Sequence, residues 1–287
     1  MVDRQTVPVR HSEGIFGRRN TSGPELYYRA TFPDGALAAV VGILHGYGEH
    51  GKRYGHVADA WADRGIASVA LDLRGHGRAQ GARGYCERFQ EYVDDASELA
   101  PFLKERAGEA PLYLFGHSFG GLVAASAAIA QPVPWRGIVL SAPYFGLALR
   151  VPRIKLLAGK IASRIVPKFA LPTGIRGSDV SHDAERAREY DEDPLVFTKA
   201  TARWFTETSA AQTRALSSAR SFAMPLYVAM GTDDRVAKIE SARAFFDAAS
   251  SRDKRWDERK GLFHEVLNEP EWRGIADSMA DWIVMAR

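Results

Sequence analysis

Cysteine is almost absent from this 287-residue sequence, with Cys86 as its single example. One cysteine excludes an intramolecular disulfide, and it also excludes a CxxC motif or a cysteine zinc cluster. Neither sign of charge dominates, because 38 basic and 35 acidic residues leave a formal net charge of only +3. The basic residues form no long run and do not alternate with aromatic residues. We therefore expect no nucleic-acid partner.

Long apolar runs are missing as well. No stretch approaches the ~20 apolar residues that a membrane-spanning helix needs. The N-terminal segment, residues 1–19, contains charged residues along its length and lacks the apolar core of a secretory signal. By default we expect an intracellular, soluble, cytoplasmic protein, and we leave peripheral contact with a membrane surface open.

Short apolar runs alternate along the chain with helical patterns. The runs are continuously apolar, which is typical of strands buried in a parallel sheet. Their alternation with helices predicts an α/β fold with a mostly parallel, doubly wound sheet. The predicted strands are 38–44, 67–71, 112–115, 137–140, 226–230 and 255–260, and the predicted helices are 56–64, 89–106, 122–130 and 239–250.

The alternation stops between about residues 145 and 216, where prolines and helical segments occur without a convincing strand. We predict that residues 147–215 form a helical cap, inserted into a core made of residues 1–146 and 216–287. This prediction makes the cap a lid over one edge of the sheet.

One helical segment of the predicted cap has an unusual charge pattern. Residues 151–170 contain five basic residues and no acidic one. The simpler expectation is a helix whose apolar side packs on the core while its basic side is solvated. The alternative is a basic amphipathic surface that contacts anionic lipid or guides an acyl chain inward. The apolar positions on one helical face are Ile154, Leu157, Ala158, Ile161 and Ile165.

The segment Gly116-His117-Ser118-Phe119-Gly120 lies between a predicted strand and a predicted helix. Gly-x-Ser-x-Gly at a sharp strand-to-helix turn exposes the serine hydroxyl as a nucleophile. Glycine is needed at both ends because side chains there would collide with the neighbouring strand and helix. We predict Ser118 as the nucleophile of the site.

A nucleophilic serine needs a histidine base and a carboxylate that orients the histidine. In this type of sheet the three follow in the chain order Ser, Asp, His, at the carboxyl ends of strands. The strand 226–230 is followed by Asp233 and Asp234, of which we favour Asp234 and keep Asp233 as the alternative. Of the two histidines after the serine, we expect His182 on the surface of the cap. His264 follows the last predicted strand, and we predict it as the base.

The loop after strand 38–44 is rich in glycine, which allows its backbone to approach a substrate carbonyl closely. We predict that the amides of Tyr47 and Phe119 form the oxyanion hole. Residues 72–77 close the next strand, and we expect this glycine-rich loop to brace the serine turn.

Histidine and glutamate residues near the first loop raise the question of a metal site. Their spacing matches no known ligand pattern, so we expect no metal. The residues concerned are His45, Glu49, His50 and His56.

Four motifs occur together in this chain: HGYGEHGKRY at 45–54, RGHG at 74–77, GHSFGG at 116–121 and GTDDR at 231–235. With the segment 178–195, they resemble the α/β-hydrolase branch of monoglyceride lipases and lysophospholipases. The resemblance extends from about Gly35 almost to the C-terminus. It implies the acid at Asp234, the base at His264, an oxyanion hole at Tyr47 and Phe119, and a mobile amphipathic cap over an acyl channel.

Two positions depart from that family. Phe119 stands where the family more often has methionine, and we expect it to narrow the acyl entrance. Ala237 occupies the position of a regulatory cysteine in the animal monoglyceride lipases, so we expect no thiol sensitivity there.

The sequence therefore predicts a serine hydrolase that cleaves carboxylic esters of single-chain lipids through an acyl-enzyme, with monoacylglycerol as the favoured substrate. The alternatives are a lysophospholipase, a general carboxylesterase, and a non-catalytic binding protein of the same fold. We expect a small-molecule acyl ester as the partner and no cofactor, and the sequence predicts no oligomeric state.

Overall fold

The computed structural model describes residues 7–16, 23–130, 135–148 and 153–285, without the side chains of residues 153–156. Its strands are β1 (Val9–Phe16), β2 (Leu26–Pro33), β3 (Ala39–Leu44), β4 (Ile66–Asp72), β5 (Leu112–His117), β6 (Trp135–Ser141), β7 (Ala170–Pro172), β8 (Lys199–Thr201), β9 (Leu226–Gly231) and β10 (Lys254–Arg259). Its α-helices are α1 (Gly55–Ala62), α2 (Gln90–Ala107), α3 (Phe119–Ala130), α4 (Arg153–Ile165), α5 (Gly177–Val180), α6 (Ala184–Glu192), α7 (Ala202–Ser217), α8 (Ile239–Ala248) and α9 (Trp272–Met285). Two 3-10 turns, η1 (Gly51–Tyr54) and η2 (Ala219–Ser221), complete these elements.

Eight of these strands form one sheet in the order β1-β2-β4-β3-β5-β6-β9-β10. Neighbouring strands from β4 to β10 are parallel, and β2 is antiparallel to both β1 and β4. The predicted mostly parallel, doubly wound sheet is thereby confirmed. Because the parallel strands end at one edge, the loops that follow β3, β5, β9 and β10 meet there.

The sheet has an apolar layer on each face. One layer joins the sheet to α1 and α9 and includes the fully buried Trp61 and Met279. The other joins it to α2, α3, α7 and α8 and includes Leu99 and Phe245. β3, β4, β5 and β9 are buried along their whole length between these layers, which is why they read as continuous apolar runs.

The first two strands were not predicted from the sequence. β1 pairs antiparallel with β2 at the end of the sheet, and most of its residues are exposed or half-buried. An edge strand of this kind carries no continuous apolar run, so its sequence does not stand out. At the opposite end of the chain, α9 was also not among the predicted helices. No described helix is long and apolar enough to span a bilayer.

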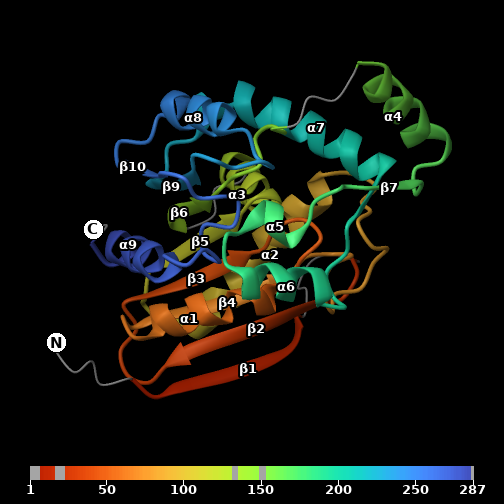
Figure 1. The fold of residues 1–287 in the computed structure, drawn as a ribbon. Coiled ribbons are helices and arrows are strands. Elements are labelled where there is room, and N and C mark those ends of the chain that lie inside the picture. The colour runs from red at the N-terminus through yellow and green to blue at the C-terminus, as the bar shows by residue number, and fades with distance from the viewer. Residues whose placement is uncertain (1–6, 17–22, 131–134, 149–152, 286–287) are drawn as a thin grey trace.

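The segment between β6 and β9 contains α4 to α7 and stands over the carboxyl edge of the sheet (Figure 1). We keep the term cap for residues 147–215. α4 packs on α7, where the hydroxyls of Ser163 and Thr206 lie 2.7 Å apart. Our expectation of a cap without strands is wrong, because β7 and β8 form a short antiparallel pair. Three residues per strand are too few to give a recognisable pattern in the sequence.

The α4 helix differs from the simpler expectation in the direction of its apolar side chains. Leu157, Ile161 and Ile165 are 60%, 52% and 74% exposed, so this stripe does not pack on the core. Ala158 and Ala162, together with Gly159, instead line the cavity beneath the helix. The side chain of Ile154 lies outside the described part. In Figure 1 the helix stands at the rim of the molecule, next to β7.

Candidate active site

Ser118 occupies the sharp turn between β5 and α3. Its backbone has φ +50, a left-handed conformation that is unusual for a residue with a side chain. The turn is held by the Ser118 amide, which donates to the Ser141 carbonyl at 2.9 Å, and by the Tyr144 amide, which donates to the Ser118 carbonyl at 3.0 Å. The serine is thus presented at the carboxyl edge of the sheet in a fixed direction.

The two glycines of the motif are explained by the contacts that a side chain would make. A Cβ at residue 116 would lie 2.4 Å from the Gly120 carbonyl oxygen. A Cβ at residue 120 would lie 2.2 Å from the Leu44 carbonyl oxygen, at the end of β3. Since neither backbone oxygen can move aside cheaply, the turn packs directly on β3 only with glycine.

A chain of hydrogen bonds joins the serine to the two other predicted residues. Ser118 Oγ lies 2.8 Å from His264 Nε2, and His264 Nδ1 lies 2.8 Å from Asp234 Oδ2. The other carboxylate oxygen, Asp234 Oδ1, accepts from the amides of Val236 and Ala237, each at 2.8 Å. The structure therefore brings Ser118, His264 and Asp234 together, although 146 residues separate the first two in sequence.

The neighbouring Asp233 does not take part in this chain. It is exposed, and its Oδ1 accepts from the Thr232 hydroxyl at 2.9 Å. Of the two aspartates left open by the turn after β9, only Asp234 contacts the imidazole.

The electrostatics of His264 favour its protonated form. Burial, the largest single influence, lowers the pKa of His264, but the charge and hydrogen bond of the adjacent Asp234, together with the Glu265 and Glu49 carboxylates, outweigh it. The net pKa is raised above its ordinary value. The nearby His117 behaves in the opposite way, because burial, with a contribution from His264, lowers its pKa to about 4. One imidazole at the site is thus suited to accept a proton, while its neighbour at 4.9 Å between ring centroids stays neutral.

His45 fixes the direction of the Tyr47 amide. The Leu73 amide donates to His45 Nε2 at 2.9 Å, so the proton of this ring resides on Nδ1, which donates to the Gly46 carbonyl at 2.7 Å. That carbonyl and the Tyr47 N–H belong to one planar trans peptide and point in opposite directions. Among the described residues, neither the Tyr47 amide nor the Phe119 amide has a partner. Both are available to an oxygen atom beside Ser118.

The loop after β4 supports the first loop rather than the serine turn. Asp72 is fully buried and accepts from the Gly51 and Arg78 amides, each at 2.8 Å, and from Arg29. The Leu73 amide binds His45, as described above. We expected this loop to brace the turn at Ser118, and the structure shows that its hydrogen bonds reach the loop after β3.

The polar residues that raised the question of a metal have other partners. His50 Nε2 lies 2.9 Å from Asp193 Oδ2 of the cap, and His56 Nε2 lies 2.8 Å from the Leu267 carbonyl. Glu49 accepts from Arg53, Tyr54 and the Gly46 amide. Within the described ranges, no group of three or more metal-ligating side chains comes together.

A cavity of about 670 Å³ opens above Ser118, between the sheet edge and the cap. This volume is in the usual range for small-molecule sites. Most of its lining is apolar and includes residues of α4 and α7, and its polar lining, which we call the polar part, includes Glu49, Glu265 and Arg235. The apolar lining consists mainly of Phe119, Tyr144, Leu147, Ala158, Ala162, Phe169, Leu171, Trp204 and Phe205.

Phe119 forms part of the cavity floor. Its buried ring lies edge-on to Tyr92 at 4.9 Å and tilted to Trp204 at 5.2 Å between centroids. The expectation that this residue narrows the cavity stays a prediction. Ala237 is fully buried, and its amide is one of the two that hold Asp234.

His182 has a role that sequence reasoning missed. Its side chain is 45% exposed, as expected for a surface residue, yet its Nδ1 lies 3.0 Å from the fully buried Glu269. Its ring stacks on Phe263 at 3.6 Å, and Glu269 also accepts from the Phe263 amide at 2.7 Å. The cap is therefore joined to the residue that precedes His264. Nothing in the sequence pairs these positions, because they are 87 residues apart.

The fold and this arrangement of serine, histidine and aspartate define a class of protein, the serine hydrolases of the α/β-hydrolase fold. The profile of the family described as serine aminopeptidase, S33, matches residues 35–271. The chain belongs to this α/β-hydrolase family, and it is an enzyme of the serine carboxylic ester hydrolase class.

Two relatives and one solved structure resemble the chain over most of its length. A monoacylglycerol lipase of Mycolicibacterium smegmatis is 30% identical over 286 residues, which cover 97% of this chain and 99% of that protein. Phospholipase YtpA of Bacillus subtilis is 34% identical over 236 residues, which cover 81% of this chain and 90% of that protein. The crystal structure of Paleococcus ferrophilus monoacylglycerol lipase has a TM-score of 0.80 at 29% identity and covers 91% of this chain and 99% of that one.

Proposed function

We propose that this protein hydrolyses monoacylglycerols and similar single-chain lipid esters, with Ser118 as nucleophile, His264 as general base and Asp234 as the residue that orients it. The observation that carries the proposal is the pair of 2.8 Å contacts from Ser118 through His264 to Asp234, at the floor of a largely apolar cavity. The cavity suits one hydrocarbon chain, and its polar part beside the serine suits an alcohol group.

In the first step Ser118 Oγ attacks the ester carbonyl while its proton passes to His264 Nε2. Asp234 stabilises the imidazolium that forms, as the raised pKa of His264 reflects. The Tyr47 and Phe119 amides stabilise the tetrahedral oxyanion, and one such donor contributes about 3 kcal/mol to the transition state. The imidazolium then protonates the departing glycerol oxygen, which leaves the acyl group on the serine.

In the second step water is the nucleophile and Ser118 is the leaving group. His264 removes a proton from the water, the hydroxide attacks the acyl carbonyl, and the serine leaves with the returned proton. The fatty acid is released and the enzyme is regenerated. No step requires a cofactor.

The substrate class is tested by measuring fatty-acid release from a set of oleoyl compounds: monooleoylglycerol, trioleoylglycerol, lysophosphatidylcholine and an oleoyl anilide. We expect the highest kcat/KM with monooleoylglycerol and no release by Ser118→Ala. Preference for the anilide over every ester would contradict the proposal. Binding of the lipids without release by the wild-type enzyme would favour the alternative, a binding protein.

A second candidate activity is that of a lysophospholipase. Arg235 lines the polar part of the cavity, where its guanidinium lies over the Phe263 ring at 4.1 Å. A cation at this place favours an anionic head group, and the relative from B. subtilis is named a phospholipase. Higher kcat/KM with lysophosphatidic acid than with monooleoylglycerol would favour this activity.

We also propose that the cap contacts an anionic lipid surface, which would make the protein peripheral to a membrane. Residues 151–178 contain no acidic residue. Apolar side chains are exposed beside exposed basic ones, the composition of a helix that lies in a lipid interface. The apolar members are Leu157, Ile161, Ile165, Val166, Phe169 and Leu171, and the basic members, which we call the basic cap set, are Lys160, Arg164 and Lys168.

A further inference from the structure

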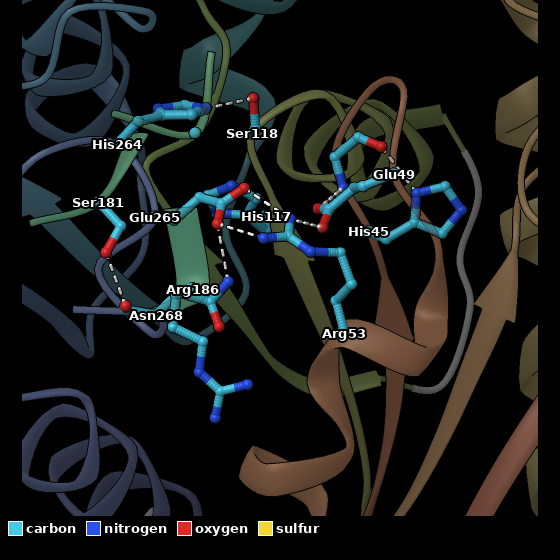
Figure 2. Close-up of polar contacts among 12 residues, drawn as sticks. His45, Glu49, Arg53, His117, Ser118, Ser181, Arg186, His264, Glu265 and Asn268 are labelled. Atoms are coloured by element: carbon cyan, nitrogen blue, oxygen red, sulfur yellow. Dashed lines mark hydrogen bonds and ion pairs between the residues drawn. The ribbon is translucent and has the colours of Figure 1, made fainter. Parts of the chain in front are cut away.

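A buried group of charges lies between the loop that follows β3 and the loop that carries His264 (Figure 2). It consists of Glu49, Arg53 and Glu265, whose side chains are between 3% and 9% exposed. Burying three ions costs free energy, and apolar residues of similar size often replace such groups without loss of stability. A stabilising role alone is therefore a weak explanation for their presence.

Arg53 bridges the two carboxylates. Its Nη1 donates to Glu49 Oε2 at 2.7 Å and to Glu265 Oε1 at 2.6 Å, and its Nη2 donates to Glu265 Oε2 at 2.7 Å. The guanidinium is planar, and its donors have fixed directions. The distance between the two carboxylates is consequently set by the geometry of one side chain.

One end of this bridge holds the loop that carries the Tyr47 amide. Glu49 Oε1 accepts from the Gly46 amide at 2.6 Å and from the Tyr54 hydroxyl at 2.7 Å. Gly46 lies directly before Tyr47, and a Cβ on it would lie 3.4 Å from the Ser118 Cβ. A shift of the Glu49 carboxylate would therefore move the Tyr47 amide relative to the serine.

The other end of the bridge holds the loop of His264. Glu265 is the next residue in the chain, and its Oε2 also accepts from Asn268 Nδ2 at 2.8 Å. The Glu265 amide donates to the Val180 carbonyl of the cap at 2.8 Å. The guanidinium of Arg53 lies 5.0 Å from the ring centroid of Tyr190, also in the cap. Both loops and the cap thus meet at Arg53.

We propose that Arg53 is a positioning residue, which fixes the distance between the Tyr47 amide and His264 by bridging Glu49 and Glu265. The inference rests on the proposed function of Ser118 and His264 but not on the identity of the ester. Displacement of reacting groups by about 1 Å costs on the order of 100-fold in rate, and a looser bridge permits such a displacement.

The test compares Arg53→Lys with the wild-type enzyme and with Arg243→Lys as a matched control. Lysine keeps the charge but cannot donate in fixed directions to both carboxylates. Arg243 pairs with Asp247 on the exposed surface of α8, so its replacement changes an ion pair outside the site. The readouts are kcat and KM for p-nitrophenyl butyrate, and the rate at which ethyl fluorophosphonate phosphonylates Ser118.

In the phosphonylation reaction Ser118 Oγ forms a bond to phosphorus, the P–F bond breaks, fluoride leaves, and the serine proton passes to His264. This step uses the same base and the same oxyanion amides as ester cleavage, and it requires no lipid. For Arg53→Lys we expect kcat and the phosphonylation rate to fall about 10- to 100-fold, with KM within about threefold of wild type. Arg243→Lys should match wild type in all three values.

Three results would overturn the inference. The first is a folded Arg53→Lys enzyme with wild-type kcat. The second is an increase in KM at unchanged kcat, which would make Arg53 and its partners substrate contacts. The third is a wild-type protein that does not react with the fluorophosphonate, and this result would also overturn the proposed function. A wild-type protein that is phosphonylated but releases no fatty acid would contradict the lipid substrate alone.

A second variant keeps the proposal testable if Arg53→Lys does not fold. Glu265→Gln has almost the same shape but offers one acceptor oxygen instead of two, so we expect a loss of about 3- to 10-fold in phosphonylation rate. Where both variants fold, the double variant should be no slower than Arg53→Lys, because both changes break the same bridge. Additive losses would mean that the two side chains act independently, against the proposal.

Discussion

The substitution Asp234→Asn tests the proposed triad without a change in side-chain shape. Asp234 Oδ1 accepts two amides, from Val236 and Ala237, at 2.8 Å each, while Oδ2 faces His264 Nδ1 at 2.8 Å. An amide NH₂ cannot accept hydrogen bonds, so the asparagine oxygen has to occupy the position of Oδ1. Its NH₂ group then faces His264.

This orientation forces the wrong tautomer on the imidazole. With a donor opposite it, His264 Nδ1 becomes an acceptor, and the ring proton moves to Nε2, which faces the Ser118 hydroxyl. A protonated Nε2 cannot remove the serine proton. A substitution of this kind lowers kcat by about 10⁴-fold, which corresponds to about 5 kcal/mol.

The assay is the initial rate of p-nitrophenyl butyrate hydrolysis at saturating substrate, with Asp233→Asn as the control. Asp233 is exposed, and its carboxylate accepts from the neighbouring Thr232 hydroxyl and has no contact with the imidazole among the described residues, so we expect at most a twofold change for its variant. Similar small losses in the two variants would refute the reasoning, and so would a folded Asp234→Asn enzyme that retains a tenth of the activity.

Three other predictions follow from the geometry of the site and the cap. His264 must be neutral to act as base, and its pKa is raised above the ordinary 6.5. We therefore expect kcat/KM to be constant at high pH and to fall with a single titration as the pH drops through the raised pKa of His264. An increase in activity toward pH 5 would contradict this prediction. Replacing all three residues of the basic cap set by glutamine should remove about 1 kcal/mol of attraction per residue, which lowers the affinity for phosphatidylserine vesicles about 100-fold. The hydrolysis of p-nitrophenyl butyrate should not change. Equal vesicle binding by the variant and the wild-type protein in a sedimentation assay would exclude the proposed contact. Gly120→Ala should lower the melting temperature by several degrees because its Cβ would lie 2.2 Å from a backbone oxygen. Gly159→Ala should not, because a Cβ there would meet no atom within 4 Å among the described residues apart from its own helix backbone; equal melting temperatures would contradict the packing argument.

The central strands and the meeting of Ser118, Asp234 and His264 at one edge of the sheet could be predicted from the sequence for physical reasons. A strand buried on both faces has a continuous apolar pattern, and β3, β4, β5 and β9 all have it. Parallel strands end at one edge, so residues that directly follow β5, β9 and β10 had to lie near one another. Chain order then left few choices for the aspartate and the histidine.

Other features depend on tertiary contacts that no local pattern reports. The edge strand β1 is largely solvated and has no apolar signature. The apolar face of α4 was identified, but whether it packs on the core or faces solvent depends on the position of α7. The bridge at Arg53 joins residues more than 200 positions apart, and its charges look like ordinary surface residues in the sequence. The contact of His182 with Glu269 is of the same kind.

The most direct test is to quench the enzyme with acid during turnover of monooleoylglycerol, digest it, and measure the masses of its peptides by mass spectrometry. If Ser118 attacks the ester, the peptide that contains it gains the mass of one oleoyl group, and the Ser118→Ala protein gains none and liberates no oleic acid. Fatty-acid release by that variant at the rate of the unaltered enzyme, or an oleoyl group attached to a different residue, would contradict the account.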